Sequence, residues 1–131
     1  MTGVPTYSGP FGKQQAERLL WRAGFGPRQG DAIKLARLGL QGAVYSLTRP
    51  SAPEALIGPN PVDEKGRPID PVNLVGHDHL WWLDRMIRTT TPLIERMTLI
   101  WHSWFATSNQ GVAQQQLMLN QNQLFRQNAL G

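Results

Sequence analysis

The sequence predicts an all-α fold, an irregular or orthogonal bundle of five or six helices with a long proline-rich loop. Two observations support this prediction. Apolar residues recur at the three- and four-residue spacing of a helix in six stretches of the chain. Glycine and proline stand between several of these stretches, where helices end. The chain has 131 residues, 40% of them hydrophobic, which is enough for one domain with its own core.

Three helices are expected in the first 49 residues, a segment rich in basic side chains. Their apolar patterns cover residues 11–23, 28–38 and 40–48. Gly24 suits the left-handed position that follows the last turn of a helix. The third helix is expected to end before Pro50, because the residue before a proline avoids helical geometry.

Residues 50–76 hold six prolines and three glycines, and this composition predicts a long loop or linker. Loops of this length are uncommon inside a compact domain. We therefore expect either an ordered arm on the surface or a flexible hinge.

Residues 77–131 are expected to form three longer helices, over residues 79–90, 92–108 and 113–130. Thr91 and Pro92 are a suitable N-cap and first helical residue for the middle one.

The helix over residues 92–108 is apolar on nearly every side, which is typical of a buried central helix. Trp101, Trp104 and Phe105 are therefore predicted to be buried. The following helix carries an apolar face that also includes Gln114, Gln121 and Asn128, seven residues apart. This amide row is predicted to face protein, with Gln121 bonded to another helix.

The net charge of +4 is unevenly distributed. Residues 1–49 carry seven basic side chains against Glu17 and Asp31, whereas Arg126 is the only charged residue in 97–131. A long segment with one charge is poorly suited to be mostly solvated surface, so we expect much of it to be buried.

The basic first helices offer a nucleic-acid alternative. Arg18 and Arg22 lie one turn apart, with Lys34 and Arg37 on the next helix. No base-stacking aromatic platform accompanies them, and a solvated basic face is the simpler explanation, so we do not expect nucleic acid to be a partner.

His102 is the first candidate for a functional residue, because it lies among apolar residues and its charge depends on its surroundings. One hypothesis makes it a general base or ligand oriented by the carboxylate of Glu95. The alternative is a buried histidine that bonds a backbone carbonyl or Thr98.

Gln121, Asn122 and Arg126 form the second candidate, a polar network on the last helix. Amides within an apolar face need partners, so the network either holds a neighbouring helix in register or binds a polar ligand.

A third row, His77, Trp81, Asp84 and Arg88, shares one side of its helix. It lacks a closed set of metal ligands, and Trp81 is more simply explained by a cation–π contact with a nearby arginine. The chain has no cysteine and no glycine-rich phosphate loop. We expect no metal and no cofactor.

Several segments together resemble the bacterial domain-of-unknown-function family 1800. The first is the stretch Arg18-Leu19-Leu20-Trp21-Arg22-Ala23-Gly24-Phe25-Gly26-Pro27. Further along are Trp82-Leu83-Asp84-Arg85-Met86 and Glu95-Arg96-Met97-Thr98-Leu99 with Trp101-His102. The resemblance covers nearly all of the chain in the family's order. It implies the N-terminal portion of a longer protein, and the family brings no established activity. Where the family often has a second histidine, this chain has Trp104.

The sequence therefore predicts a helical scaffold or interaction module of unknown molecular function, and does not decide whether it is an enzyme. The alternative is part of a hydrolase-like or ligand-binding site using His102, completed by C-terminal residues. The expected partners are that C-terminal remainder or a second copy, through exposed apolar surface on the last helix at Leu119 and Leu130. Because no signal peptide or membrane-spanning run is visible, we expect a soluble cytoplasmic protein.

Overall fold

The computed structural model describes residues 3, 5–105 and 107–131, without the side chain of residue 109, and this part of the chain is all-α. It holds seven helices, of which α6 is a single short turn, so the predicted fold class is confirmed. The helices are α1 (Lys13–Ala23), α2 (Asp31–Arg37), α3 (Gly39–Thr48), α4 (His77–Arg88), α5 (Pro92–Trp104), α6 (Asn109–Val112) and α7 (Gln115–Gln127).

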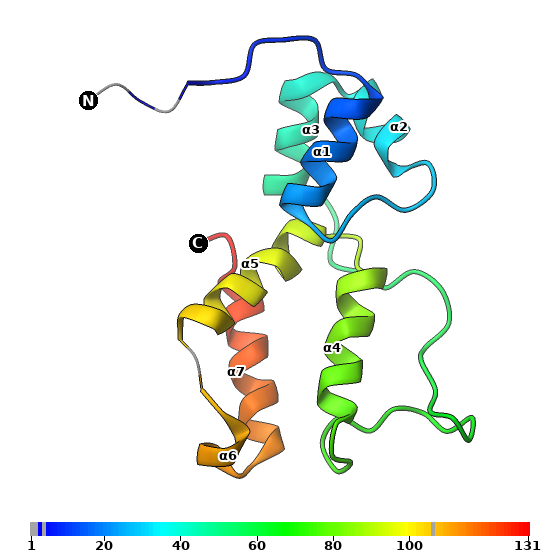
Figure 1. The fold of residues 1–131 in the computed structure, drawn as a ribbon, viewed down its shortest axis with the longest axis vertical. Helices are drawn as coiled ribbons and strands as arrows, with labels where there is room; N and C mark the ends of the chain where they lie inside the picture. The colour runs from blue at the N-terminus through cyan, green and yellow to red at the C-terminus, as the bar shows by residue number, and fades with distance from the viewer. Residues whose placement is uncertain (1–2, 4, 106) are drawn as a thin grey trace.

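Helices α1, α2 and α3 pack around a small apolar core at one end of the molecule (Figure 1). The buried residues of that core are Ala16, Leu20, Ala32, Leu35 and Ala43. Three of these five are alanines, which lets the helix backbones approach one another closely. The remaining apolar area comes from partly buried neighbours at its edge.

The turn after α1 differs from the prediction in one respect. Gly24 is extended, with φ −160°, and the left-handed glycine is Gly26, with φ 103°. A Cβ on Gly24 would lie 2.7 Å from Cβ of Pro92, so this glycine allows α1 to end against the start of α5. Gly26 lies against the ring of Trp21, which leaves little room for a side chain there.

Helix α5 connects the two ends of the molecule. It contacts α1 and α3 near its start and packs against α4 and α7 along its length (Figure 1). Pro92 is its first residue and Thr91 precedes it as the N-cap, as predicted. The hydroxyl of Thr91 pairs with the hydroxyl of Thr89 instead of capping the helix.

The loop between α3 and α4 is an ordered arm, the first of the two predicted forms. The Ala55 N–H donates to Oγ1 of Thr90 at 2.9 Å, and Leu56 forms an isolated β-bridge with Thr89. Arg88 donates to the carbonyl of Gly58 at 2.9 Å. These bonds hold the arm against the C-terminal end of α4. Beyond them, the arm extends away from that helix and then returns to its start (Figure 1).

The last two predicted helices are shorter than expected. Helix α5 ends at Trp104 and not near residue 108, and α7 covers Gln115–Gln127 within the predicted 113–130. Between them, Ala113 has φ 55°, a left-handed conformation that a helix does not contain. This residue separates the short helix α6 from α7.

The predicted burial of the α5 aromatic residues is largely wrong. Trp104 is 74% exposed and Phe105 is 59% exposed, whereas Trp101 is partly buried and donates its indole N–H to the carbonyl of Ala129 at 3.1 Å. The fully buried side chains of α5 are Glu95 and Thr98. A helix that is apolar on every side is buried only where other segments surround it. The two exposed aromatic residues lie at the C-terminal end of α5.

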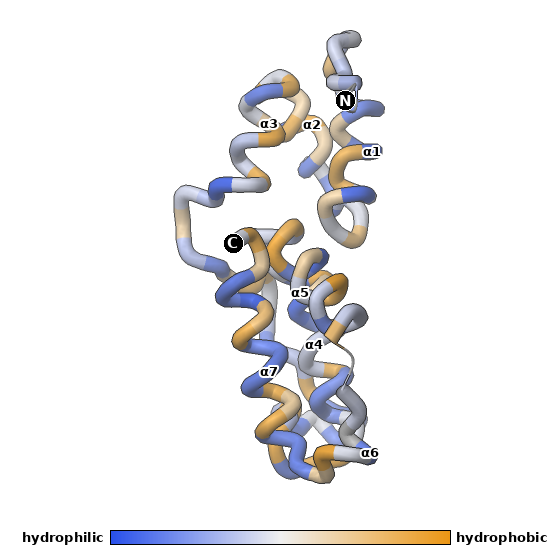
Figure 2. The backbone as a smooth tube through the Cα atoms, turned by 90° about the vertical axis from the view of Figure 1, so that its left-hand side faces the viewer, coloured by the Kyte–Doolittle hydropathy of each residue, from blue (hydrophilic) through white to orange (hydrophobic). Residues whose placement is uncertain are grey.

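Large apolar side chains are also exposed on α4 and α7. On α4 they are Leu80, Leu83 and Ile87, at 48%, 54% and 68%, spaced to share one face. On α7, Leu117 and Leu124 are exposed, and Figure 2 shows hydrophobic and hydrophilic turns alternating along this helix.

Replacing Trp104 with alanine is expected to lower the free energy of unfolding by about 1 kcal/mol or less. The side chain is mostly exposed, and its ring packs edge-on against that of Trp101, with the two ring centroids 5.6 Å apart. Urea unfolding followed by circular dichroism measures the change. A loss of about 3 kcal/mol, typical of a buried tryptophan, would show that this side chain is covered in solution.

Within the part of the chain that the structure describes, no helix combines the length and apolar character needed to cross a bilayer.

Candidate functional site

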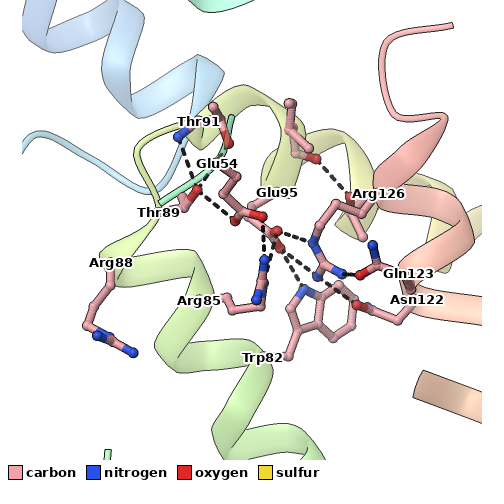
Figure 3. Close-up of polar contacts among 12 residues, drawn as sticks. Glu54, Trp82, Arg85, Arg88, Thr89, Thr91, Glu95, Asn122, Gln123 and Arg126 are labelled. Atoms are coloured by element: carbon pink, nitrogen blue, oxygen red, sulfur yellow. Dashed lines mark hydrogen bonds and ion pairs between the residues drawn. The ribbon is translucent and has the colours of Figure 1, made fainter. Parts of the chain in front are cut away.

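A buried ion pair joins α5 to α7. Glu95 on α5 is fully buried, and Arg126 on α7 is almost so. Arg126 donates through Nε to Oε1 of Glu95 and through Nη2 to Oε2, the latter at 3.1 Å (Figure 3). This two-pronged geometry is the strongest way for arginine to bind a carboxylate. The lone charge of the last 35 residues is therefore buried and paired.

The rest of the Arg126 guanidinium is held by its own helix. Its Nη2 donates to Oδ1 of Asn122 at 2.7 Å, and its Nη1 donates to Oε1 of Gln123 at 3.0 Å. Two predicted network members, Asn122 and Arg126, are thus in direct contact, and both are buried. Gln121 points elsewhere and accepts a hydrogen bond from Thr107, in the segment after α5 and not in that helix.

Helix α4 completes the cluster from the other side. The indole N–H of Trp82 donates to Oε2 of Glu95 at 3.1 Å. Nε of Arg85 lies 3.6 Å from Oε1 of Glu95, and its Nη2 donates to Glu54 in the arm. The Thr89 hydroxyl donates to the second oxygen of Glu54 at 3.0 Å. Figure 3 shows these side chains converging from the arm, α4, α5 and α7.

The charges in this cluster alternate and cancel. The series Glu54, Arg85, Glu95, Arg126 places each charge beside one or two of opposite sign. The guanidiniums of both arginines lie over the ring of Trp81, with their central carbons 5.3 Å and 5.4 Å from its centroid. Neutralisation by close partners is what permits four charged groups to be mostly buried together.

Sequence reasoning did not place Glu54, Arg85 or Trp82 in this cluster. Glu54 lies in the proline-rich arm, and Arg85 and Trp82 lie in one of the segments that resemble the family. The available signal was the single charge at Arg126, which needs a buried partner. The sequence did not indicate which of the nine acidic residues supplies it.

A pocket of about 610 Å³ opens beside the cluster, between α4 and α7. Trp81 and Trp82 from α4, His102 from α5 and Asn122 from α7 line it. The segment after α5 adds the polar side chain of Ser108. The volume is within the range of sites that hold small molecules.

The same cluster positions two of the pocket walls. Trp82 is held by the hydrogen bond that it donates to Glu95, and Asn122 is held by the hydrogen bond that it accepts from Arg126. A site is precise when the groups behind it hold its walls in place.

His102 enters the pocket as a ring packed against other rings. Its centroid lies 5.0 Å from that of Trp82 and 6.1 Å from that of Phe125. Burial lowers the pKa of His102 below its usual value of 6.5, so the imidazole is neutral at neutral pH. Among the described residues no hydrogen bond or ion pair joins His102 to Glu95, whose oxygens face Arg126 and Trp82. A catalytic role for His102 and Glu95 stays a prediction.

The residues of the third predicted row, on α4, take part in several separate contacts. His77 accepts a hydrogen bond from the backbone of Asp70 at 3.1 Å, and Asp84 binds Arg88 at 2.7 Å. Trp81 contacts Arg85, as the cation–π explanation predicts. Over the described residues, no group of three or more histidine, aspartate or glutamate side chains is placed to hold a metal ion.

The basic side chains of the first helices are exposed. Arg18 and Arg22 on α1 and Lys34 and Arg37 on α2 all face solvent. Nucleic-acid binding through them stays a prediction.

Lowering the pH is expected to destabilise the protein through His102. Because its pKa is lowered on folding, the unfolded chain binds more protons than the folded chain, and stability falls as the pH drops from above 6.5 through the folded-state pKa. The urea midpoint is measured between about pH 7.5 and about pH 5 for the wild type and for His102→Gln. The variant should show the weaker pH dependence. The matched control is His79→Gln, an exposed histidine. Equal slopes in wild type and His102→Gln would contradict the burial of the imidazole.

The fold and the site define a class of protein, an all-α protein with a pocket that is supported by a buried charge cluster. A family model described as "Protein of unknown function (DUF1800)" matches residues 18–131. The chain belongs to this family, as the resemblance predicted. Comparisons with curated proteins and with solved structures gave no match.

Proposed function

We propose that this chain is a binding module and that the pocket between α4 and α7 is its binding site. The observation that carries the proposal is that buried charged residues hold two walls of the pocket in place. Trp82 and Asn122 are held by a fully buried carboxylate and a buried guanidinium. Burying charges is costly, and a simple helix contact could be made with apolar residues. A cluster that orients two pocket walls is well suited to ligand binding.

The test compares ligand binding by a variant whose pocket is blocked with ligand binding by a matched variant that carries the same substitution outside the pocket. Ser108 lines the pocket, whereas Ser103 is exposed on α5 and does not line it. Saturation-transfer NMR is run with methyl β-D-glucopyranoside, cellotetraose, inorganic phosphate, acetate, tetramethylammonium and indole. At least one probe should bind the wild type and Ser103→Trp and lose binding in Ser108→Trp. If no probe binds, or if both variants behave alike, the proposal is wrong.

The exposed face of α4 favours a second candidate, an interaction module that pairs with a second copy of the chain. Leu80, Leu83 and Ile87 form an apolar stripe at helical spacing. Two such stripes can pack against each other and remove apolar surface from water. Sedimentation at increasing concentration should show association, and Leu83→Lys should abolish it. A chain that stays monomeric would exclude this candidate.

A further inference from the structure

We infer that the pocket binds a neutral, hydroxyl-rich ring of the kind found in sugars. The inference rests on the proposed binding function and adds the chemical class of the ligand. Three features of the pocket lead to it: its charge, its aromatic walls and its unused hydrogen-bonding groups.

The charged groups of the pocket disfavour an anion. Among the described residues that line it, none is a lysine or arginine, and Asp78 contributes a carboxylate. The two nearby guanidiniums, Arg85 and Arg126, are committed to Glu54 and Glu95. Recognition of phosphate or carboxylate normally uses arginine, lysine or a helix N-terminus. The helix N-terminus at this pocket is the first turn of α4, which carries the carboxylate of Asp78. A negatively charged ligand would also meet Asp78.

The aromatic walls disfavour a cation. A tryptophan can bind a cation over its face, but Trp81 already has the guanidiniums of Arg85 and Arg126 over its ring. The ring of Trp81 is therefore already used by two cations. The indole of Trp82 remains a flat apolar wall that is fixed by its hydrogen bond to Glu95. The weakly positive C–H face of a neutral ring suits such a surface.

The hydrogen-bonding groups of the pocket suit hydroxyls. Asn122 is only 4% exposed, and its Oδ1 is occupied by Arg126. Its Nδ2 donates to no other residue in the described part of the chain, although the side chain lines the pocket. Neutral His102 offers one donor and one acceptor, and Asp78 offers acceptors. A hydroxyl both donates and accepts, so a ring with several hydroxyls matches this mixed set.

The decisive variant is Asn122→Asp. It keeps an oxygen for Arg126 and removes the two N–H donors of a side chain that lines the pocket. The matched control is Asn120→Asp, an exposed position on the same helix. Affinity is measured by NMR titration with methyl β-D-glucopyranoside and with cellotetraose, beside phosphate, acetate and tetramethylammonium. Circular dichroism verifies that both variants fold.

We expect at least one of the two sugars to bind the wild type and Asn120→Asp and to bind Asn122→Asp at least about tenfold more weakly. Binding of the glucoside shows that a free ring suffices, and binding of cellotetraose alone shows that the ring is taken within a chain. His102→Phe keeps the ring contact with Trp82 and removes the nitrogens, so it should also weaken binding.

Three results would overturn the inference, and they differ in what they say about the proposed function. If phosphate, acetate or tetramethylammonium binds in the pocket and neither sugar does, the ligand class is wrong and the binding function stands. If a sugar binds with equal affinity to wild type, Asn122→Asp and His102→Phe, it binds elsewhere and the inference fails. If none of these compounds binds and indole does not bind either, the inference and the proposed function fail together.

Discussion

Replacing Glu95 with glutamine is expected to lower the free energy of unfolding by about 3–5 kcal/mol. The change removes the charge that faces Arg126 and Arg85, and it leaves the guanidinium of Arg126 buried without a counter-ion. Urea unfolding at neutral pH measures the loss. The control is Glu64→Gln, an exposed carboxylate in the arm, which should change stability by about 0.5 kcal/mol or less.

A double variant tests whether uncompensated charge is the cause. Glu95→Leu combined with Arg126→Met removes both charges and keeps side chains of similar length. Most of the lost stability should return, because a buried ion pair replaced by apolar groups is often neutral. Arg85 keeps its partner Glu54 in this variant. If the double variant is as unstable as Glu95→Gln, the loss reflects packing and not charge.

Replacing Leu20 with alanine is the second change with a large expected effect, a loss of about 2–5 kcal/mol. Leu20 is one of two leucines among the buried residues of the core of α1, α2 and α3, where the others are alanines. Small neighbours on helix backbones have few ways to fill the space that a leucine leaves. The measurement is thermal or urea unfolding.

The matched control for this core change is Leu38→Ala. Leu38 lies between α2 and α3 and is 53% exposed. Its replacement should cost about 1 kcal/mol or less. Similar losses for the two variants would contradict the core that the structure places around Leu20.

The sequence predicted the helices well because the signals for a helix are local. Residue spacing, the Thr91-Pro92 start of α5 and the glycines and prolines between helices all act within a few residues. The same local signals were weaker after Trp104. There, α6 lies between the two predicted helices, and the left-handed Ala113 stands where the helix over residues 113–130 was expected to begin.

The candidate site was predicted in part. Asn122 and Arg126 belong to one buried cluster, as expected for amides and a lone charge in a polar-rich but uncharged segment. Gln121 lies outside that cluster and binds Thr107. On a helix, adjacent residues point about 100° apart, and only the neighbouring helix decides which of two amides is covered.

By itself, the sequence determined the all-α class, the order of the helices and the membership of residues 18–131 in the family. Only the tertiary structure decided that Glu95 faces Arg126, 31 residues later, and that the polar side of α5 is buried while Trp104 is exposed. The physical reason is that spacing along a helix fixes which residues share a face. Contacts between segments far apart in the chain fix which face is covered, and no local pattern encodes them.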